Sequence, residues 1–136
     1  MNRVLALDVG DRRIGVSMTD PMQIIASPFS VIDRKISKDI FIEILDIVND
    51  YSIQTIVIGM PITLKGTDSH QTKSVKEFIV QLSSHTDINI EIIDERLSSV
   101  SAEKELIKKG VKTGHNKGEI DKTAATIILQ EYLASK

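Results

Sequence analysis

The chain has 136 residues, 41% of them hydrophobic and 26% charged, with a formal net charge of −2. These values are typical of one folded domain rather than a disordered chain, so we expect a single domain over residues 1–136. The lack of cysteine excludes thiol catalysis, disulfides and thiolate-bound zinc. No apolar run approaches the roughly 20 residues of a membrane span. With strand-like sequence directly after the first residues and no secretory leader, we expect a cytoplasmic protein without a membrane partner.

The first half of the chain predicts a β-meander and then a helix. Apolar and β-branched runs predict strands over 3–9, 14–19 and 25–32, and turn-forming residues at 19–21 separate the second from the third. The short connections favour antiparallel pairing. Over residues 39–51 the apolar residues recur at helical spacing, which predicts an amphipathic helix.

The second half alternates strands with helices. Strands are predicted over 55–58, ending at Gly59, and over 90–93, with a helix over 69–84 between them. Helices over 99–109 and 120–133 follow, joined by a glycine- and lysine-rich loop at 111–119. Since strands separated by helices pair in parallel through right-handed crossovers, the sequence predicts an α/β protein. Its mixed sheet contains three antiparallel strands extended by two parallel ones.

Acidic residues stand where two of these strands end. Asp8 lies at the end of the first strand, and Asp94 and Glu95 follow the fifth. If the fourth strand lies between them, Asp8 and Glu95 are separated by two strand spacings, about 10 Å. Gly59 then stands between them with no side chain, which leaves room for a hydrated cation. Alternatively, Asp94 and Glu95 belong to an ordinary turn at the end of the strand, where their carboxylates pair with Arg96.

A further carboxylate, Asp121, lies in the first turn of the last predicted helix. Ala124 and Ala125 follow three and four residues later on the same helical face. These small residues would let the helix pack close to the sheet and bring Asp121 toward Asp8. The equally weighted alternative is that Asp121 has no role in metal binding and stabilises the helix by complementing its dipole.

Clustered carboxylates without histidine or cysteine select hard cations, here Mg²⁺ or Mn²⁺, of the kind that assist phosphodiester cleavage. His70, His85 and His115 are scattered without ligand spacing, although His115 in the basic loop could reach a phosphate. Residues 104–122 contain six lysines against three acids, which is either a solvated face or a nucleic-acid contact. With few aromatic residues, we expect contact with the nucleic-acid backbone rather than base stacking.

Four blocks of sequence, in order along the whole chain, resemble the YqgF family of RNase H-like proteins. The blocks are Asp8-Val9-Gly10 with Arg13-Ile14-Gly15-Val16, Gly59-Met60-Pro61 with Gly66-Thr67, Asp94-Glu95-Arg96-Leu97, and Ile120-Asp121 with Ala124-Ala125 and Ile128-Leu129-Gln130. The resemblance implies a five-stranded RNase H-like domain with metal-dependent nuclease activity. It implies a catalytic triad of Asp8, Glu95 and Asp121. Which of Asp94 and Glu95 binds the metal stays open, as does the role of Asp11.

The resemblance also implies that basic residues next to these motifs bind the phosphates of the substrate. Arg12 and Arg13 follow the turn after Asp8 and are suited to bidentate phosphate contacts, or else are ordinary strand-edge residues. Arg96 either binds phosphate or orients its acidic neighbours. Salt-sensitive backbone contacts are expected from four lysines, Lys65, Lys109, Lys112 and Lys117.

The resemblance favours maturation of the small-subunit ribosomal RNA precursor, with structured RNA and ribosomal particles as partners. The alternative within the nucleases is a Holliday junction resolvase, which needs two active sites and therefore a dimer. No sequence feature demands a strong dimer, so we expect a monomer or a weak homodimer. Outside the nucleases, one alternative is a non-catalytic nucleic-acid-binding or ribosome-associated module. Another alternative is an ATP-binding enzyme of the actin type. Such enzymes need two lobes to close over the nucleotide, and 136 residues supply only one.

Overall fold

The computed structural model of the chain describes residues 2–61, 70–94 and 117–135, with side chains in the last segment described from residue 124 onward. The elements in chain order are β1 (Arg3–Val9), β2 (Arg13–Thr19), β3 (Ala26–Asp33), α1 (Ile40–Asp50), β4 (Ile53–Met60), α2 (His70–Ser83), β5 (Asn89–Asp94) and α4 (Lys117–Ala134). The predicted helix over 99–109 lies outside the described residues. None of the helices within them has the length and hydropathy of a membrane-spanning segment.

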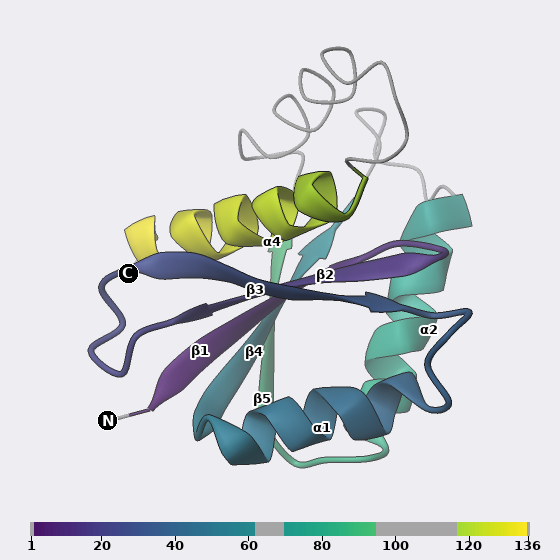
Figure 1. Ribbon diagram of the computed structural model, residues 1–136, viewed down its shortest axis with the longest axis horizontal. Coiled ribbons are helices and arrows are strands. Elements are labelled where there is room, and N and C mark those ends of the chain that lie inside the picture. Colours follow the sequence, from purple (N-terminus) through teal and green to yellow (C-terminus); the bar gives the residue numbers. More distant parts are fainter. Residues whose placement is uncertain (1, 62–69, 95–116, 136) are drawn as a thin grey trace.

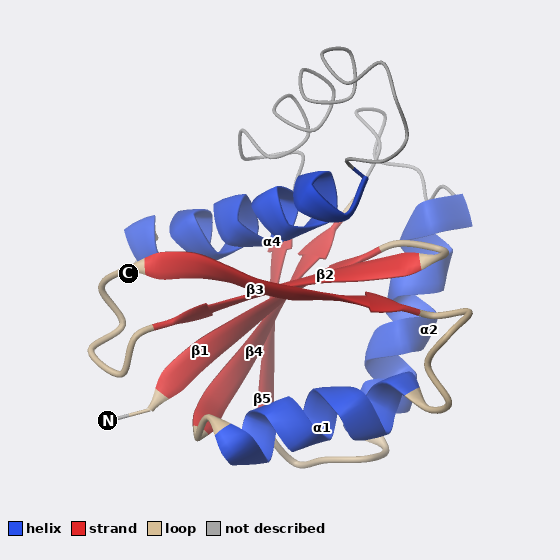
Figure 2. Cartoon of the chain, viewed as in Figure 1, coloured by secondary structure: helices blue, strands red, loops and turns tan. Residues whose placement is uncertain are grey.

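The strands form one five-stranded sheet in the order β3-β2-β1-β4-β5. β1 pairs antiparallel with β2, and β2 with β3, whereas β4 pairs parallel with both β1 and β5. This confirms the predicted antiparallel meander extended by two parallel strands, and it confirms that the fourth strand separates the first from the fifth. Figure 2 shows the sheet as a central layer between helices.

Helices cover both faces of the sheet, and alternate residues of each strand face opposite sides. On one face, Leu5 and Leu7 of β1 belong to the core cluster that includes Ile44 of α1 and Phe78 of α2. On the other face, buried β1 and β4 residues pack against Ile128, Leu129 and Tyr132 of α4. Figure 1 shows this division, with α1 and α2 on one side of the sheet and α4 on the other.

The boundaries of α1 follow directly from its sequence. Asp39, the residue before the helix, has an extended backbone, and its carboxylate accepts hydrogen bonds from the backbone N–H groups of Phe41 and Ile42 at 3.0 and 3.2 Å. An N-cap of this kind stabilises a helix by about 1 kcal/mol, because it satisfies amides that have no partner within the helix. The predicted start of the helix at residue 39 is therefore its cap.

Several strand boundaries differ from the predicted ranges by one residue, and β4 and α4 extend furthest beyond theirs. β4 covers Ile53–Met60 rather than 55–58, because its parallel pairing with β5 continues to Met60 and Asp94. Gly59 is therefore inside the strand rather than after it. α4 begins at Lys117, so residues 117–119 are helical where a loop was predicted. The glycine at 118 costs only about 1 kcal/mol in a helix of this length, which packing of the following turns offsets.

Candidate active site

Asp8 lies near the end of β1 on the face of the sheet that α4 covers, because it has the same strand parity as Val4 and Ala6. In the antiparallel register it pairs with Gly15 of β2. On its other side, the parallel pairing of Leu7 with Ile58 brings Gly59 level with Asp8 one residue further on. Both neighbours in the sheet therefore lack a side chain. The half-buried Asp8 carboxylate stands between two glycines with no flanking side chain from either strand.

α4 packs closely over this same face. Ala124 and Ala125 are 1% and 0% exposed. The Ser17 hydroxyl of β2, itself fully buried, donates a hydrogen bond to the Ala125 carbonyl at 2.9 Å. Ser17 follows Gly15 by two residues and so shares its face. The prediction that small residues let this helix approach the sheet is confirmed.

Asp121 belongs to α4, one turn before Ala125, but its side chain lies outside the described part of the structure. Figure 1 shows that α4 begins at the end of the sheet where β1 connects to β2. The first turns of α4 therefore lie toward the end of β1 at Val9. Whether the two carboxylates meet stays a prediction.

Asp94 lies on the opposite face of the sheet from Asp8. It pairs with Met60, which belongs to the core cluster under α1 and α2. The preceding residue, Ile93, packs against the α4 cluster instead. Because faces alternate along a strand, the Asp94 side chain cannot share the α4 face with Asp8 in a regular strand.

The turn that joins β1 to β2 is tight at Gly10. The backbone N–H of Gly10 donates a hydrogen bond to the Arg13 carbonyl at 2.9 Å. A Cβ atom at Gly10 would lie 2.8 Å from that same carbonyl oxygen, closer than real Cβ contacts. Any side chain at this position would therefore force the turn after Asp8 to move.

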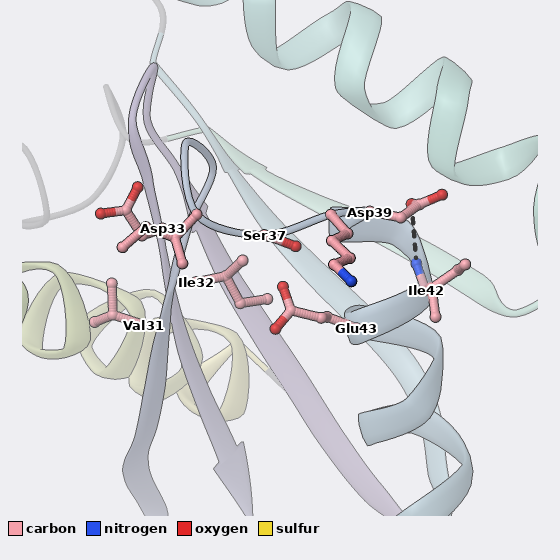
Figure 3. Close-up of a pocket in the computed structure, with 9 residues that line it drawn as sticks. Val31, Ile32, Asp33, Ser37, Asp39, Ile42 and Glu43 are labelled. Carbon is pink, nitrogen blue, oxygen red and sulfur yellow. Dashed lines mark hydrogen bonds between the residues drawn. The ribbon is translucent and has the colours of Figure 1, made fainter.

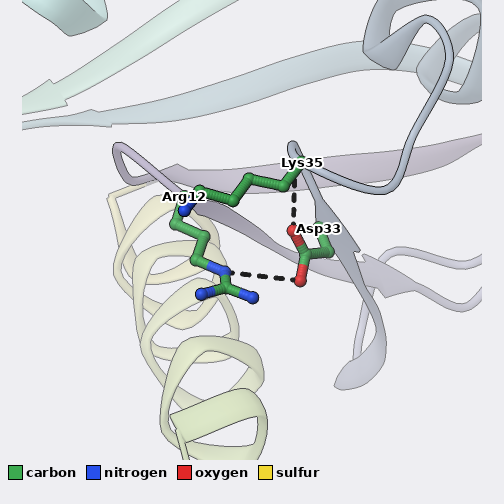
Figure 4. A network of polar contacts seen from close by, with 3 residues as sticks. All are labelled: Arg12, Asp33 and Lys35. Carbon is green, nitrogen blue, oxygen red and sulfur yellow. Dashed lines mark hydrogen bonds and ion pairs between the residues drawn. The ribbon is translucent and has the colours of Figure 1, made fainter.

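Arg12 in this turn contacts a carboxylate of the chain itself. Its Nε atom lies 3.5 Å from Asp33 Oδ2, with the two side chains 50% and 22% exposed (Figure 4). The backbone N–H of Lys35 donates to the other Asp33 oxygen at 2.9 Å. That hydrogen bond, followed by the charges of Arg12 and Arg13, holds the pKa of Asp33 below its usual range. Arg13 pairs with Asp33 in the β2–β3 register.

The described histidines have ordinary surroundings. His85 stacks on Phe41 with ring centroids 4.9 Å apart, and its Nδ1 lies 2.7 Å from the Gln81 carbonyl. His70 and Asp11 approach only to 4.0 Å, and both are largely exposed. Within the described residues, no group of three or more acidic or histidine side chains is placed to hold a metal.

A groove of about 690 Å³ lies elsewhere, between β3 and α1. Figure 3 shows Ile32 and Glu43 directed toward this space. Of its carboxylates, Asp39 caps α1 and Asp33 engages Arg12, so both already serve the local structure. The groove lies beside α1, on the face of the sheet opposite to Asp8, and is therefore not a continuation of the site around Asp8.

Several predicted site residues lie outside the described part of the structure, namely Lys65, Glu95, Arg96, Lys109, Lys112 and the side chain of Lys117. Conversely, the structure gives a role to three residues to which the sequence analysis assigned none. Gly15 flanks Asp8, Asp33 contacts Arg12, and Arg34 holds the Gly10 turn. Of these, only Gly15 had a sequence signal, because it belongs to the Arg13-Ile14-Gly15-Val16 block and is a glycine inside an otherwise apolar strand.

The sheet order and helix placement define an RNase H-like α/β fold, which structural comparison confirms. Thermus thermophilus RuvC, solved in complex with a Holliday junction substrate, superposes with a TM-score of 0.62, covering 99% of this chain and 95% of that one at 11% sequence identity. At that identity the likeness concerns the fold alone.

Sequence comparison identifies the family. Residues 2–135 match the family model described as "RuvX: Holliday junction resolvase", and the chain belongs to this family. A protein of Maridesulfovibrio salexigens is 39% identical over 132 residues, covering 97% of this chain and 98% of its own. One of Roseiflexus sp. is 40% identical over 134 residues, covering 98% and 95%. Both carry the name "Putative pre-16S rRNA nuclease". These relationships confirm the YqgF resemblance and make the chain a member of a nuclease family.

Proposed function

We propose that this protein is a divalent-metal-dependent nuclease that hydrolyses phosphodiester bonds of structured RNA in the maturation of the 16S ribosomal RNA precursor. The names of its full-length relatives support the substrate. The observation that carries the chemistry is the placement of Asp8 on the α4 face between Gly15 and Gly59. Because neither neighbouring strand places a side chain beside it, a carboxylate in that position would leave room for a hydrated cation.

Asp8, Glu95 and Asp121 are the proposed ligands. Strand alternation puts Asp94 on the face away from Asp8, which favours Glu95, the next residue, over Asp94. Carboxylate oxygens without cysteine or histidine suit Mg²⁺ or Mn²⁺. When bound, such an ion would activate water and stabilise the leaving oxygen. The role of the chain is to fix the three carboxylates, with Asp8 on β1 and Asp121 on a helix packed tightly against β2.

Basic residues would hold the phosphates on either side of the cleaved bond. Arg12 is half exposed and its contact with Asp33 is long, so substrate phosphate can replace that carboxylate. Arg13 lies next to it at the start of β2. The remaining candidates are Lys65, Arg96, Lys109, Lys112 and Lys117. Because such contacts release counterions, cleavage should weaken as salt rises.

Two acidic neighbours provide the sharpest test of this ligand set. Precursor RNA would be incubated with wild type, Asp8→Asn, Asp94→Asn and Glu95→Gln, each with Mn²⁺ and with EDTA. We expect loss of cleavage for Asp8→Asn and Glu95→Gln, and near wild-type cleavage for Asp94→Asn. Equal Mn²⁺-dependent activity in wild type and Asp8→Asn would refute the metal-nuclease proposal. Loss in Asp94→Asn with retention in Glu95→Gln would reverse the ligand assignment.

Holliday junction resolution is the second candidate, because the family model carries that description and RuvC, which shares the fold, was solved with a junction. Cutting a junction symmetrically requires two active sites, and hence a homodimer on the substrate. We propose a monomer or weak homodimer acting in the cytoplasm on RNA, with ribosomal particles as partners. Parallel assays on precursor RNA and a four-way DNA junction distinguish the two substrates.

A further inference from the structure

The turn after Asp8 is held in place from a distant part of the chain, the connection between β3 and α1. Arg34, the first residue after β3, makes two hydrogen bonds to this turn. Its guanidinium donates to the Gly10 carbonyl at 2.8 Å, and its backbone N–H donates to the Arg12 carbonyl at 2.7 Å. The residue before it, Asp33, contacts the Arg12 side chain. Consecutive residues therefore hold both the backbone and a side chain of the turn.

The Arg34 side chain is itself fixed by packing. Its guanidinium carbon lies 5.9 Å from the centroid of the Phe78 ring, and Phe78 is 1% exposed in the core under α2. A cation over an aromatic ring is attracted to the negative face of that ring, more strongly where both are partly removed from water. The hydrogen bond to Gly10 is part-buried and charge-assisted, which strengthens it. Arg34 thus ties the turn to the rigid core rather than to solvent.

This attachment concerns Asp8 because the turn begins immediately after it. Asp8 is the last residue but one of β1, and only Val9 separates it from Gly10. A glycine turn without outside support would sample several conformations, since glycine restricts the backbone least. Holding the Gly10 and Arg12 carbonyls removes this freedom and fixes the end of β1, where the Asp8 carboxylate is carried.

We propose that Arg34 is a positioning residue for the metal site, which acts on Asp8 through the backbone of the Gly10–Arg13 turn. This inference rests on the proposed function, because it concerns the same cation. Arg34 comes from a different part of the chain from the proposed ligands. It has no carboxylate and does not itself bind the ion.

The chain offers a matched control in Arg3, at the opposite end of β1. Its guanidinium also donates to a backbone carbonyl, that of Tyr51, at 3.3 Å, and also lies 5.9 Å from an aromatic centroid, the Tyr51 ring. Arg3→Gln therefore removes the same kinds of contact as Arg34→Gln, but away from Asp8. The Arg3 hydrogen bond is exposed whereas the Arg34 bond is part-buried, so the melting temperature of each variant is needed to separate lost stability from lost positioning.

The experiment measures Mn²⁺ binding without substrate, from the electron paramagnetic resonance signal of the free ion, alongside the melting temperature. We expect Arg34→Gln to weaken Mn²⁺ binding about tenfold, as for residues that orient metal ligands. Arg3→Gln should bind Mn²⁺ like wild type. Arg34→Lys, which keeps the charge and one donor, should lie between wild type and Arg34→Gln.

The sign of the change separates positioning from simple electrostatics. Removing a positive charge near a cation site would by itself tighten Mn²⁺ binding, so weaker binding requires loss of geometry. Unchanged or tighter binding in Arg34→Gln overturns the inference, as does an equal loss in Arg3→Gln. If Arg34→Gln does not fold, the comparison of Arg34→Lys with Arg3→Lys decides in the same way. Absence of Mn²⁺ binding in wild type, or no loss in Asp8→Asn, would instead refute the proposed function.

Discussion

Replacing Ala125 with leucine tests whether the close approach of α4 to the sheet serves the active site. Ala125 is 0% exposed, and its carbonyl accepts the hydrogen bond from Ser17. Leucine adds three carbon atoms where the structure has no space for them. Overpacking of this kind costs about 1–3 kcal/mol. For a domain of this size, that lowers the melting temperature by roughly 4 °C per kcal/mol.

The functional effect of Ala125→Leu should exceed the effect on stability. The protein stays folded at 25 °C if its stability is within the usual range of about 5–15 kcal/mol. The helix, however, must move away from β2 and carry Asp121 with it. A displacement of about 1 Å at a catalytic group costs about 100-fold in rate. We therefore expect a fall of that order in the cleavage rate at a temperature where circular dichroism shows a native fold.

Two further variants isolate the cause. Ala134→Leu makes the same chemical change at the exposed end of α4 and should leave both stability and cleavage unchanged. Ser17→Ala removes the hydrogen bond without adding volume, at a cost of about 1 kcal/mol, and should retain most of the activity. A folded Ala125→Leu protein that cleaves at the wild-type rate would refute the reasoning.

Two other predictions concern the turns at either end of β2. Gly10→Ala should destabilise the protein and reduce Mn²⁺ affinity, because the new Cβ would lie 2.8 Å from the Arg13 carbonyl oxygen; unchanged urea unfolding and Mn²⁺ binding would contradict this. Asp20 accepts backbone hydrogen bonds from residues 22, 24 and 25, and the bonds from Ile25 and Ile24 lower its pKa. Its contribution to stability is therefore fully present above the unfolded pKa of about 3.9 and lost as pH falls below it. Urea unfolding should show a difference between wild type and Asp20→Ala that is larger at pH 7 than at pH 3; an equal difference would show that the charge is not responsible.

The sheet could be predicted from sequence because each strand is a distinct apolar run and the connections leave few topologies open. Short connections specify the meander over residues 3–33, and helical connections specify the parallel strands. Strand ends were less predictable. The extension of β4 to Met60 depends on its pairing with Asp94, a contact between segments 34 positions apart.

The surroundings of Asp8 could be predicted only in part. Gly59 was recognised as a gap once the strand order was assumed, whereas the role of Gly15 depends on the β1–β2 register. The distinction between Asp94 and Glu95 likewise depends on which residue faces α4, and an offset of one residue reverses the answer.

The partners of the basic residues were not predictable. Arg12 and Asp33 are distant in sequence and meet only because β2 and β3 pair with Arg13 opposite Asp33. Arg34 had no motif of its own, since its role comes from the carbonyls that it reaches. Such contacts depend on tertiary placement rather than on local pattern or propensity.

The most direct test of the account is a crystal structure of the protein soaked with Mn²⁺, with the ion located by its anomalous scattering. We predict a peak on the α4 face of the sheet, coordinated by carboxylate oxygens of Asp8, Glu95 and Asp121. No peak at Asp8, or three carboxylates that do not converge on one ion, would contradict the proposed chemistry.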